Sequence, residues 1–362
     1  MSKVRVLLVG PSLDIMGGQA VQAERLFRNL QENPHLDVDF LAVNPRLPRP
    51  FAWCQRVKYI RTVATSAAYF YSLFRRVGSF DVVHAFSASY TSYLLAPLPA
   101  MAIARLLGKS TVLNYRSGEA DDHLSRWKRT AVPTMRRFAD RIVVPSRYLV
   151  EVFGAHGLRA EAIHNFVPLD RLPYRRRTTL TPRFLSNRNL EPLYNVECTI
   201  RAFHEIRAAF PAATMMVAGD GSERERLGAL VVALGLGDAV TFVGRVTNEQ
   251  MDSLYDASDV YLNSPSIDNM PGSILEAFAA GLPVATTDAG GIPYIVRDGQ
   301  NGSMVRIGDA DALAQAALRY LLEPAHALRL ADTARAECEA LYSWRTVQAE
   351  WEALYTSMRT SA

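Results

Sequence analysis

The stretch SPSIDNMPGSILEAFAAGLPVATTDAGGIPYIV, from Ser264 to Val296, decides how this chain is interpreted. Its pattern predicts a loop containing Asp268 and then a helix with Ser273 as its N-cap and Glu276 in its first turn. The N-terminus of a helix has unpaired backbone N–H groups and a partial positive charge, which suit a phosphate. Ionised carboxylates nearby suit sugar hydroxyls because they are strong hydrogen-bond acceptors. A nucleotide-sugar contains both groups, so the pattern predicts a site for one.

Each of these residues also has an ordinary structural interpretation. Ser273 and Glu276 fit the S-x-x-E capping box, in which the glutamate only ties down its own helix. Asp268 and Asn269 fit a turn, and Gly281 fits a helix stop before the next strand pattern. Taken singly, these structural interpretations are favoured. All the features in this order are much less expected by chance, so the combination favours a binding site.

The segment resembles the signature of the retaining glycosyltransferases of family 4, which have the GT-B fold. That signature has two glutamates separated by seven residues and then a Gly-Gly-x-Pro turn, matched here by Gly290, Gly291 and Pro293. The resemblance implies that Glu276 holds the ribose of the donor. It implies that Asp268, one methylene shorter than the family's first glutamate, holds hydroxyls of the donor sugar. Four neighbouring residues are further candidates for donor binding: Asn269, Met270, Gly272 and Ser273.

Strand and helix patterns alternate along the whole chain. Short apolar runs predict strands at 4–9, 38–43, 81–84, 110–113, 141–145, 184–186, 214–218, 240–243, 260–262 and 284–286. Helix patterns include residues 20–30 and an Ala- and Leu-rich region from about residue 310 onward. This alternation predicts an α/β protein whose parallel sheets are covered by helices on both faces. The pattern weakens at 165–181, where prolines and arginines cluster, and this segment is the expected linker.

The expected linker and the family resemblance together predict the GT-B architecture, with two Rossmann-like doubly wound domains facing an interdomain cleft. The N-terminal (acceptor) domain is expected at 1–168, completed by a C-terminal helix at about 344–362. The C-terminal domain, expected at 169–343, would bind the nucleotide-sugar donor. Ligands of open α/β sheets bind at the carboxyl ends of the strands, so candidate residues in loops that follow strands are favoured.

Two arginines are candidates for a catalytic role. Arg188 begins the second domain and matches the arginine with which the family grips the donor diphosphate, but the accompanying lysine is missing and Tyr194 aligns best with it. Arg116 follows a strand at a position where the family often has a histidine near the transferred sugar. Arginine is always charged, so Arg116 suits phosphate binding and not proton transfer. The alternatives are an ordinary surface arginine at 188 and a salt bridge from Arg116 to Glu119 or Asp121.

Other candidates match further family blocks. Gly17 and Gly18 follow the first strand, where a glycine pair lets the backbone approach the donor phosphate or the acceptor. Their spacing is not G-x-G-x-x-G, which disfavours a dinucleotide cofactor. Val243 and Gly244 match a block whose backbone contacts the nucleotide base. Three residues are candidates for the acceptor or the cleft: Glu119, Asn165 and Ser146. Ser146 alternatively caps the next helix, and Asn165 alternatively belongs to a linker turn.

Composition is that of an ordinary globular protein of 362 residues, long enough for two domain cores. Three scattered cysteines and seven scattered histidines predict no disulfide framework and no metal site, and they favour a reducing cytosol. The D-x-D pattern of Asp37 and Asp39 lies in a strand pattern and is interpreted as a solvated edge. The only small molecule expected is the nucleotide-sugar co-substrate, without a cofactor or metal. No signal peptide is expected, nor any apolar run of the about 20 residues that span a bilayer.

Charge is divided unevenly along the chain. Residues 1–168 carry 22 Lys and Arg against 12 Asp and Glu, whereas residues 169–362 carry 18 against 24. The stretch 40–80 has seven basic and no acidic residues, and its apolar residues recur at helical spacing: Trp53, Val57, Ile60, Ala64, Ala67, Tyr71 and Phe74. A core helix with a solvated basic face and attachment to an anionic membrane surface both fit this pattern. A second basic run at 126–137 supports the membrane, and nucleic acid is disfavoured because no recognition motif is present.

The sequence therefore predicts a cytoplasmic, retaining glycosyltransferase, peripheral to the cell membrane if the basic stretch binds lipid. It would move a sugar from a nucleotide-sugar to a glycan or lipid-linked acceptor without a metal ion. The family's retention is attributed to front-face attack, with the leaving phosphate taking the acceptor proton, so no side-chain nucleophile is assigned. Two alternatives stay open. One is a catalytically weak relative that serves as a binding or scaffold subunit, and the other is a different GT-B enzyme, such as a nucleotide-sugar epimerase.

Overall fold

The computed structural model describes residues 3–12, 18–45 and 58–359. The chain forms two compact units, each built around its own six-stranded parallel sheet. Unit 1 contains residues 1–164 and 347–362, and unit 2 contains residues 165–346. The division lies at the start of the segment 165–181, four residues before the boundary expected at 168.

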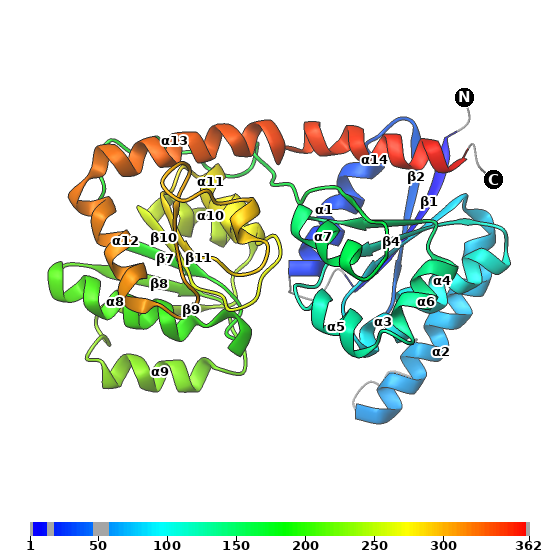
Figure 1. Ribbon diagram of the computed structural model, residues 1–362, viewed down its shortest axis with the longest axis horizontal. Coiled ribbons are helices and arrows are strands. Elements are labelled where there is room, and N and C mark those ends of the chain that lie inside the picture. Colours follow the sequence, from blue (N-terminus) through cyan, green and yellow to red (C-terminus); the bar gives the residue numbers. More distant parts are fainter. Residues whose placement is uncertain (1–2, 13–17, 46–57, 360–362) are drawn as a thin grey trace. The chain divides into compact units, whose positions relative to one another are not determined.

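Unit 1 is a doubly wound sheet with helices on both faces (Figure 1). Its elements are β1 Val4–Gly10, α1 Gly18–Gln31, β2 Leu36–Ala42, α2 Lys58–Arg76, η2 Val77–Ser79, β3 Val82–Ser87, α3 Thr91–Leu95, α4 Pro97–Leu106, β4 Ser110–Tyr115, α5 Ala120–Arg126, α6 Ala131–Phe138, β5 Arg141–Val144, α7 Arg147–Ala155, β6 Glu161–Ala162 and α14 Trp344–Arg359. The strand order is β2-β1-β3-β4-β5-β6. The order reverses between β1 and β3, which is therefore the switch point of this sheet.

Successive residues of a buried strand face opposite sides of the sheet, which divides the core of unit 1 into two layers. On one side, Leu7 and Leu113 pack with Tyr69 of α2 and Met135 of α6. On the other side, His84 of β3 stacks on Trp351 of α14 with 4.9 Å between ring centroids. From Val347 onward α14 is thus part of unit 1 and its core, whereas the first residues of the helix, Trp344 to Thr346, belong to unit 2.

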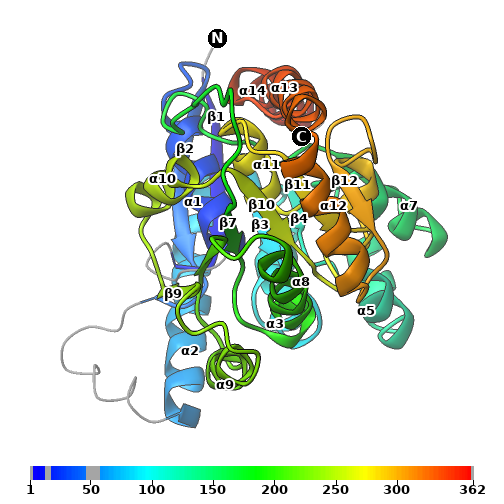
Figure 2. The ribbon, with the colours of Figure 1, turned by 90° about the vertical axis from the view of Figure 1, so that its left-hand side faces the viewer.

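Unit 2 repeats the architecture with a different strand order, β12-β11-β10-β7-β8-β9. Its elements are β7 Arg183–Asn187, η3 Pro192–Tyr194, α8 Val196–Ala209, β8 Thr214–Ala218, α9 Arg224–Ala233, β9 Val240–Gly244, α10 Asn248–Ala257, β10 Val260–Asn263, α11 Gly272–Ala279, β11 Val284–Thr287, η4 Ile292–Tyr294, β12 Ser303–Val305, α12 Ala310–Leu322 and α13 Pro324–Leu341. Figures 1 and 2 show α8 and α12 on one face of the sheet and α11 and α13 on the other. The order reverses between β7 and β10, so the switch point lies between these two strands.

The predicted α/β class with two doubly wound parallel sheets is confirmed. The strand predicted at 214–218 has the predicted bounds, and the other predicted strands are found within a few residues of their expected ends. Two strands were not predicted, Glu161–Ala162 and Ser303–Val305. Both are short and lie at sheet edges, where little apolar pattern is required.

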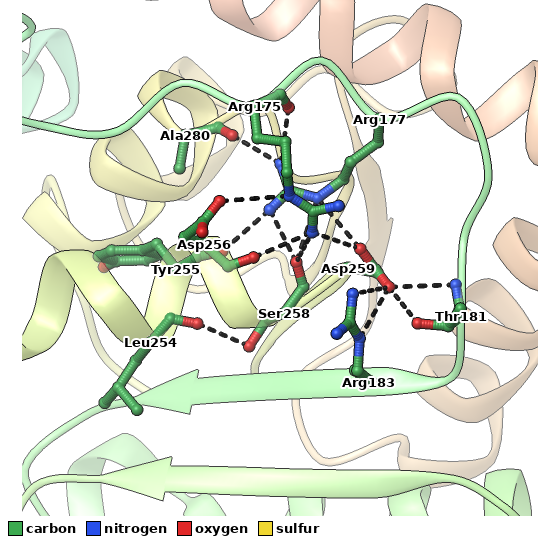
Figure 3. A network of polar contacts seen from close by, with 10 residues as sticks. All are labelled: Arg175, Arg177, Thr181, Arg183, Leu254, Tyr255, Asp256, Ser258, Asp259 and Ala280. Atoms are coloured by element: carbon green, nitrogen blue, oxygen red, sulfur yellow. Dashed lines mark hydrogen bonds and ion pairs between the residues drawn. The ribbon is translucent and has the colours of Figure 1, made fainter.

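An arginine and aspartate network fastens the segment after the unit boundary to the body of unit 2 (Figure 3). The side chain of Arg177 is fully buried and donates to the carbonyl oxygens of Tyr255 at 2.9 Å, Ser258 at 2.7 Å and Ala280 at 2.7 Å. These carbonyls lie at the C-terminal ends of α10 and α11, where a cation is favourable. Asp259, 1% exposed, is the counter-ion of this buried guanidinium.

Asp259 also holds three other partners. Arg175 Nη2 donates to it at 2.8 Å, Arg183 Nη2 at 3.0 Å and the backbone N–H of Thr181 at 3.1 Å, and the Thr181 hydroxyl donates as well. The segment expected to be a linker is therefore fixed to unit 2 from Arg175 to Arg183 by one buried carboxylate. Breaking this network is expected to destabilise unit 2.

Helix α2 shows that its predicted apolar stripe is not a core face. Among the side chains of α2 whose burial is described, those from residue 60 onward, Tyr69 and Leu73 are the buried ones. Ile60, Tyr71 and Phe74 of the stripe are exposed, Tyr71 by 62% and Phe74 by 64%. The apolar stripe is therefore not the side that α2 buries, although α2 packs in the core through Tyr69 and Leu73 and its arginines Arg61 and Arg75 are exposed, as the core-helix alternative expects. Trp53 and Val57 lie outside the described residues.

No helix within 3–12, 18–45 and 58–359 combines the length and the apolar character that crossing a bilayer requires.

Candidate functional site

The switch point of the unit 2 sheet brings together the two charged residues singled out in the sequence. Arg188 directly follows β7, and Asp268 lies in the loop that follows β10. These two strands are neighbours in the sheet although 80 residues separate Arg188 from Asp268. The carboxyl ends of strands at a switch point form the usual ligand site of an open α/β sheet.

Arg188 is held by three partners at this point. Its guanidinium forms an ion pair with Asp268, donates from Nη1 to Ser273 Oγ at 3.2 Å and lies 4.0 Å from the centroid of the Tyr194 ring. The exposed fractions of the two charged side chains are 10% and 12%. Burial opposes the charge of Arg188, but the Asp268 carboxylate and the neighbouring tyrosines together outweigh burial and raise the pKa of the guanidinium. Arg188 is therefore a permanent cation, and its Nε lacks a hydrogen-bond partner in the described structure.

Helix α11 begins two residues earlier than its predicted cap suggests. Pro271 is the N-cap, with no side-chain capping bond, and Gly272 and Ser273 are the first two helical residues. The prediction that Ser273 is the N-cap is wrong, because its hydroxyl accepts from Arg188 instead. The first amides of an α-helix have no acceptor within the helix, so the end of α11 next to Arg188 suits an anion.

Glu276 does not form the capping box that was its structural alternative. Its Oε2 accepts a hydrogen bond of 2.9 Å from the hydroxyl of Tyr255, a buried residue of α10. Asn187 Nδ2 donates to the same hydroxyl at 3.2 Å. Burial and the Glu276 carboxylate raise the pKa of Tyr255 well above its ordinary value, so the phenol stays protonated and donates. Glu276 is the fifth residue of α11 and lies beyond the first turn in which it was predicted. Its carboxylate is thus positioned from β7 and α10.

The loop 268–270 is fixed by the Gly-Gly turn of the motif. Gly291 N donates to the carbonyl of Asp268 at 3.1 Å, and a Cβ at position 291 would lie 1.9 Å from the carbonyl oxygen of Asn269. Only glycine allows this approach. Met270 is buried against Asn165, whose Nδ2 donates to its carbonyl at 2.8 Å. The structure therefore brings Asn165 to the donor-side loop within unit 2.

The glycine after β8 connects the base-binding candidates with Arg188. A Cβ at Gly219 would lie 2.1 Å from the carbonyl oxygen of Arg188, so the two backbones touch. Gly219 N donates to the carbonyl of Gly244 at 2.8 Å. Val243 and Gly244 end the edge strand β9, two strands from β7, and both are half-buried. Val243 packs against the core cluster that contains the apolar residues of α11.

The predicted residues of unit 1 are more dispersed. Arg116 follows β4, and Nη1 of its half-buried side chain donates to Asn114 Oδ1 at 3.2 Å. Glu119 is an exposed residue at the N-terminus of α5. Ser146 caps α7, accepting from Leu149 N at 3.3 Å, which is its ordinary structural role. Gly18 begins α1, and Gly17 lies outside the described residues.

Sequence reasoning missed the residues that position the site from a distance. Tyr255 looks like a core aromatic of an amphipathic helix, and Asn187 looks like the polar end of a strand. Nothing local in the sequence indicates that their side chains meet at Glu276. Asp37 and Asp39 lie exposed on the edge strand β2, and Asp39 pairs with Arg76. Among the described residues, no group of three His, Cys, Asp or Glu side chains is arranged to hold a metal ion.

Two protein-family models match consecutive parts of the chain. The model described as "Glycosyltransferase Family 4" matches residues 16–171. The model described as "Glycosyl transferases group 1" matches residues 176–337. The gap between the two matches lies close to the boundary between units 1 and 2.

Curated relatives and solved structures agree with these matches. Glycogen synthase of Mycobacterium tuberculosis is 27% identical over 292 residues, which cover 77% of this chain and 69% of the relative. A GDP-mannose-dependent alpha-(1-6)-phosphatidylinositol monomannoside mannosyltransferase of Mycolicibacterium smegmatis is 26% identical over 306 residues, which cover 79% of each chain. A crystal structure of Anabaena HepE in complex with UDP-glucose superimposes with a TM-score of 0.77 at 18% identity, covering 98% of this chain and 99% of HepE. The last comparison concerns the fold alone.

Proposed function

Because the chain belongs to the family 4 glycosyltransferases and has the GT-B fold, we propose that it transfers a sugar from a nucleotide-sugar to a glycan or lipid-linked acceptor, with retention. One observation carries the proposal. Arg188, Asp268 and Ser273 meet at the switch point of the unit 2 sheet, at the N-terminus of α11. A cation and free helix amides suit a diphosphate, and carboxylates next to them suit sugar and ribose hydroxyls.

The leaving diphosphate is the largest electrostatic demand of the reaction. Arg188 and the amides of Gly272 and Ser273 would meet it, without a metal ion. Tyr194 takes the place of the family's lysine and supports Arg188 through its ring instead of adding a second cation. Asp268 is paired with Arg188, which makes it a poor nucleophile. Support for retention by front-face attack comes from this pairing and from the family.

The catalytically weak scaffold remains the second candidate, because Asp268, Tyr194 and Arg116 all depart from the family pattern. The enzyme and the scaffold are distinguished by incubating the protein with UDP- and GDP-linked hexoses, with and without glycan or lipid-linked acceptors. An enzyme releases nucleoside diphosphate and forms product. A scaffold binds nucleotide but gives no release with any donor and acceptor pair. An epimerase would interconvert two nucleotide-sugars without any acceptor.

Replacing Glu276 by alanine is expected to raise the Kd for UDP or GDP by about 10- to 150-fold, since hydrogen bonds to a charged group contribute about 1.5–3 kcal/mol. Titration calorimetry measures the affinity, and urea unfolding measures stability in the same samples. The matched control is Glu323→Ala, which removes an exposed glutamate paired with Arg319 in the same unit. If stability falls while nucleotide affinity is kept, Glu276 is only structural.

Attachment to an anionic membrane surface is proposed for α2. Exposed apolar side chains of this helix, Val63, Tyr71 and Phe74, lie next to the exposed cations Arg61 and Arg75. Apolar groups that enter a lipid interface beside cations that face anionic headgroups are the pattern of a peripheral helix. The M. smegmatis relative is named for a phosphatidylinositol-containing acceptor, which agrees with a lipid-linked substrate.

Association with vesicles is expected to rise with the anionic lipid fraction and to fall with salt, because screening acts on exposed charges. The double variant Arg61→Glu/Arg75→Glu should lose most of the binding to vesicles of phosphatidylcholine and phosphatidylglycerol in a flotation assay. Arg329→Glu, an exposed arginine of α13 in unit 2, is the control and should bind like the parent protein. Binding that is indifferent to lipid charge, to salt and to both variants would contradict the assignment.

A further inference from the structure

A cation that has no counter-ion among the described residues lies at the carboxyl end of β4 in unit 1. The backbone N–H of Arg116 donates to the carbonyl of Ser87 at 3.0 Å, which fixes the residue between the ends of β3 and β4. Its guanidinium donates to Asn114 Oδ1 and lies 5.8 Å from the centroid of the Phe86 ring. In the described part of the chain no carboxylate pairs with it, and Asp121, one expected partner, contacts His156 at 2.9 Å. The salt bridge that was the structural alternative for Arg116 is absent there.

The neutral surroundings of Arg116 are costly unless an anion joins them. Charged groups that leave water are destabilised when they are not paired. Burial lowers the pKa of Arg116 to about 10, so the guanidinium remains charged at neutral pH. A half-buried, permanent cation with neutral partners is preorganised for an oxyanion from outside the chain.

Arg116 is also held from behind by a buried chain of hydrogen bonds. Asn114 Nδ2 lies 2.9 Å from His84 Nε2, and His84 Nδ1 lies 2.7 Å from the hydroxyl of Tyr355 on α14. Burial and the charge of Arg116 lower the pKa of His84 to about 3, so its ring is neutral. Nε2 therefore accepts from Asn114, and Nδ1 donates to Tyr355. This orientation of the amide leaves Asn114 Oδ1 facing Arg116.

Ring stacking holds the residues of this hydrogen-bond chain in place. The His84 ring lies between Phe86, at 4.8 Å, and Trp351, at 4.9 Å, with interplanar angles of 20° and 26°. Trp351 in turn stacks on Tyr355 at 5.7 Å. The C-terminal helix is thus connected through one buried histidine to the loop that carries Arg116.

We propose that Arg116 binds an oxyanion carried by the substrate, either the carboxylate of a uronic acid or a phosphate group on a sugar. In this arrangement His84, Asn114 and Tyr355 are positioning residues that aim the guanidinium. The identity of the anion as part of a glycosyl donor or acceptor rests on the proposed function, whereas the presence of an anion site does not. Each part therefore has its own experiment.

The anion site is tested by titrating inorganic phosphate and glucuronate against the melting temperature, at constant ionic strength and in the presence of UDP. For at least one of the two anions, Arg116→Gln is expected to need about a tenfold higher concentration than the parent protein to reach the same rise in melting temperature. Arg137→Gln is the matched control, because Arg137 also lies 5.8 Å from an aromatic ring, that of Phe138, in the same unit. If the melting temperatures of the parent protein and of Arg116→Gln rise at the same anion concentrations, the proposal is overturned, whether or not UDP binds.

The source of the anion is tested by turnover with two matched pairs. The first pair is UDP-glucose and UDP-glucuronic acid as donors, and the second is glucose and glucose 6-phosphate as acceptors. The anionic member of one pair is expected to have a kcat/KM about 10- to 100-fold higher than the neutral member, and Arg116→Gln should lower kcat/KM for the anionic member by about that factor more than for the neutral one. If Arg116→Gln lowers kcat/KM equally for the anionic and the neutral member, Arg116 does not bind the anion of the substrate. Absence of all turnover would refute the proposed enzyme and leave the phosphate and glucuronate titrations to decide the anion site.

The positioning chain is tested by removing one hydroxyl. Tyr355→Phe should raise KM for the anionic member about threefold or more and leave kcat for the neutral member unchanged, because only the aim of Arg116 is lost. Tyr93→Phe is the control, since it removes another inter-residue bond of unit 1, the 2.8 Å contact between Tyr93 and Thr134, which is not connected to Arg116. A similar effect of both substitutions would show that the His84 chain is only structural.

Discussion

Replacing Arg188 by glutamine is expected to lower kcat/KM for sugar transfer by about 10²- to 10³-fold, the effect of removing one preorganised group that stabilises developing charge. Arg188 is the cation at the N-terminus of α11 and the partner of both Asp268 and Ser273. Its loss removes charge from the site of the leaving diphosphate and leaves Asp268 unpaired. The rate is measured as nucleoside diphosphate released in the presence of acceptor.

The control for this variant is another stacked arginine of unit 2. The guanidinium of Arg224 lies 4.0 Å from the centroid of the Phe242 ring, the same distance as Arg188 from Tyr194. Arg224→Gln should therefore lose a comparable ring contact and keep its activity. A parent-like rate in Arg188→Gln, or equal losses in both variants, would show that Arg188 does not act on the donor.

Replacing Asp259 by asparagine is expected to destabilise unit 2 by about 3–5 kcal/mol, because it leaves the buried Arg177 without a counter-ion. Urea unfolding followed by circular dichroism measures the free energy of unfolding. Asp238→Asn is the control, since Asp238 pairs with Arg207 at 2.7 Å but is 72% exposed. Exposed pairs contribute about 0–1 kcal/mol, so a similar loss in both variants would contradict the structural role of Asp259.

The same substitution has a defined pH dependence. Desolvation opposes ionisation of Asp259, but hydrogen bonds from Thr181, Arg175 and Arg183 outweigh it and lower its pKa below the ordinary 3.8. A carboxyl with a lowered pKa adds stability above its unfolded pKa and loses it as the pH falls through the folded one. The stability difference between the parent protein and Asp259→Asn should therefore be constant above about pH 5 and shrink below about pH 4. A difference that stays constant to pH 2 would contradict an ionised Asp259.

The elements that the sequence predicted well are those with a strong local pattern. The strand Thr214–Ala218 is a short apolar run between turn residues, and it was found with its predicted bounds. The cap of α11 was predicted wrongly: the hydroxyl of Ser273 accepts from Arg188, 85 residues away, and the helix already begins at Gly272. Periodicity identified the apolar stripe of α2 but gave no information about which side of the helix the sheet covers. Burial of Tyr69 and Leu73 shows that the covered side is a different one.

The residues of the candidate site likewise fall into those with a local sequence signal and those without one. Asp268, Glu276 and the Gly-Gly turn lie within one contiguous motif, so the sequence brought them together directly. Arg188 came from its position after a strand and from the resemblance. Tyr255 and His84 were not predicted to act on the site, because their roles depend on side chains that meet only after the sheets have formed. Long-range contacts between buried polar groups leave no periodic signal in a sequence.

The most direct test of the donor site is a crystal structure of the protein soaked with a nucleoside diphosphate. The diphosphate is expected at the N-terminus of α11, within hydrogen-bond distance of Arg188 and of the amides of Gly272 and Ser273, with the ribose hydroxyls on Glu276. Such a structure would also show whether Asp268 keeps its pair with Arg188 when the donor binds. A diphosphate bound elsewhere, with Arg188 and Glu276 untouched, would contradict the account.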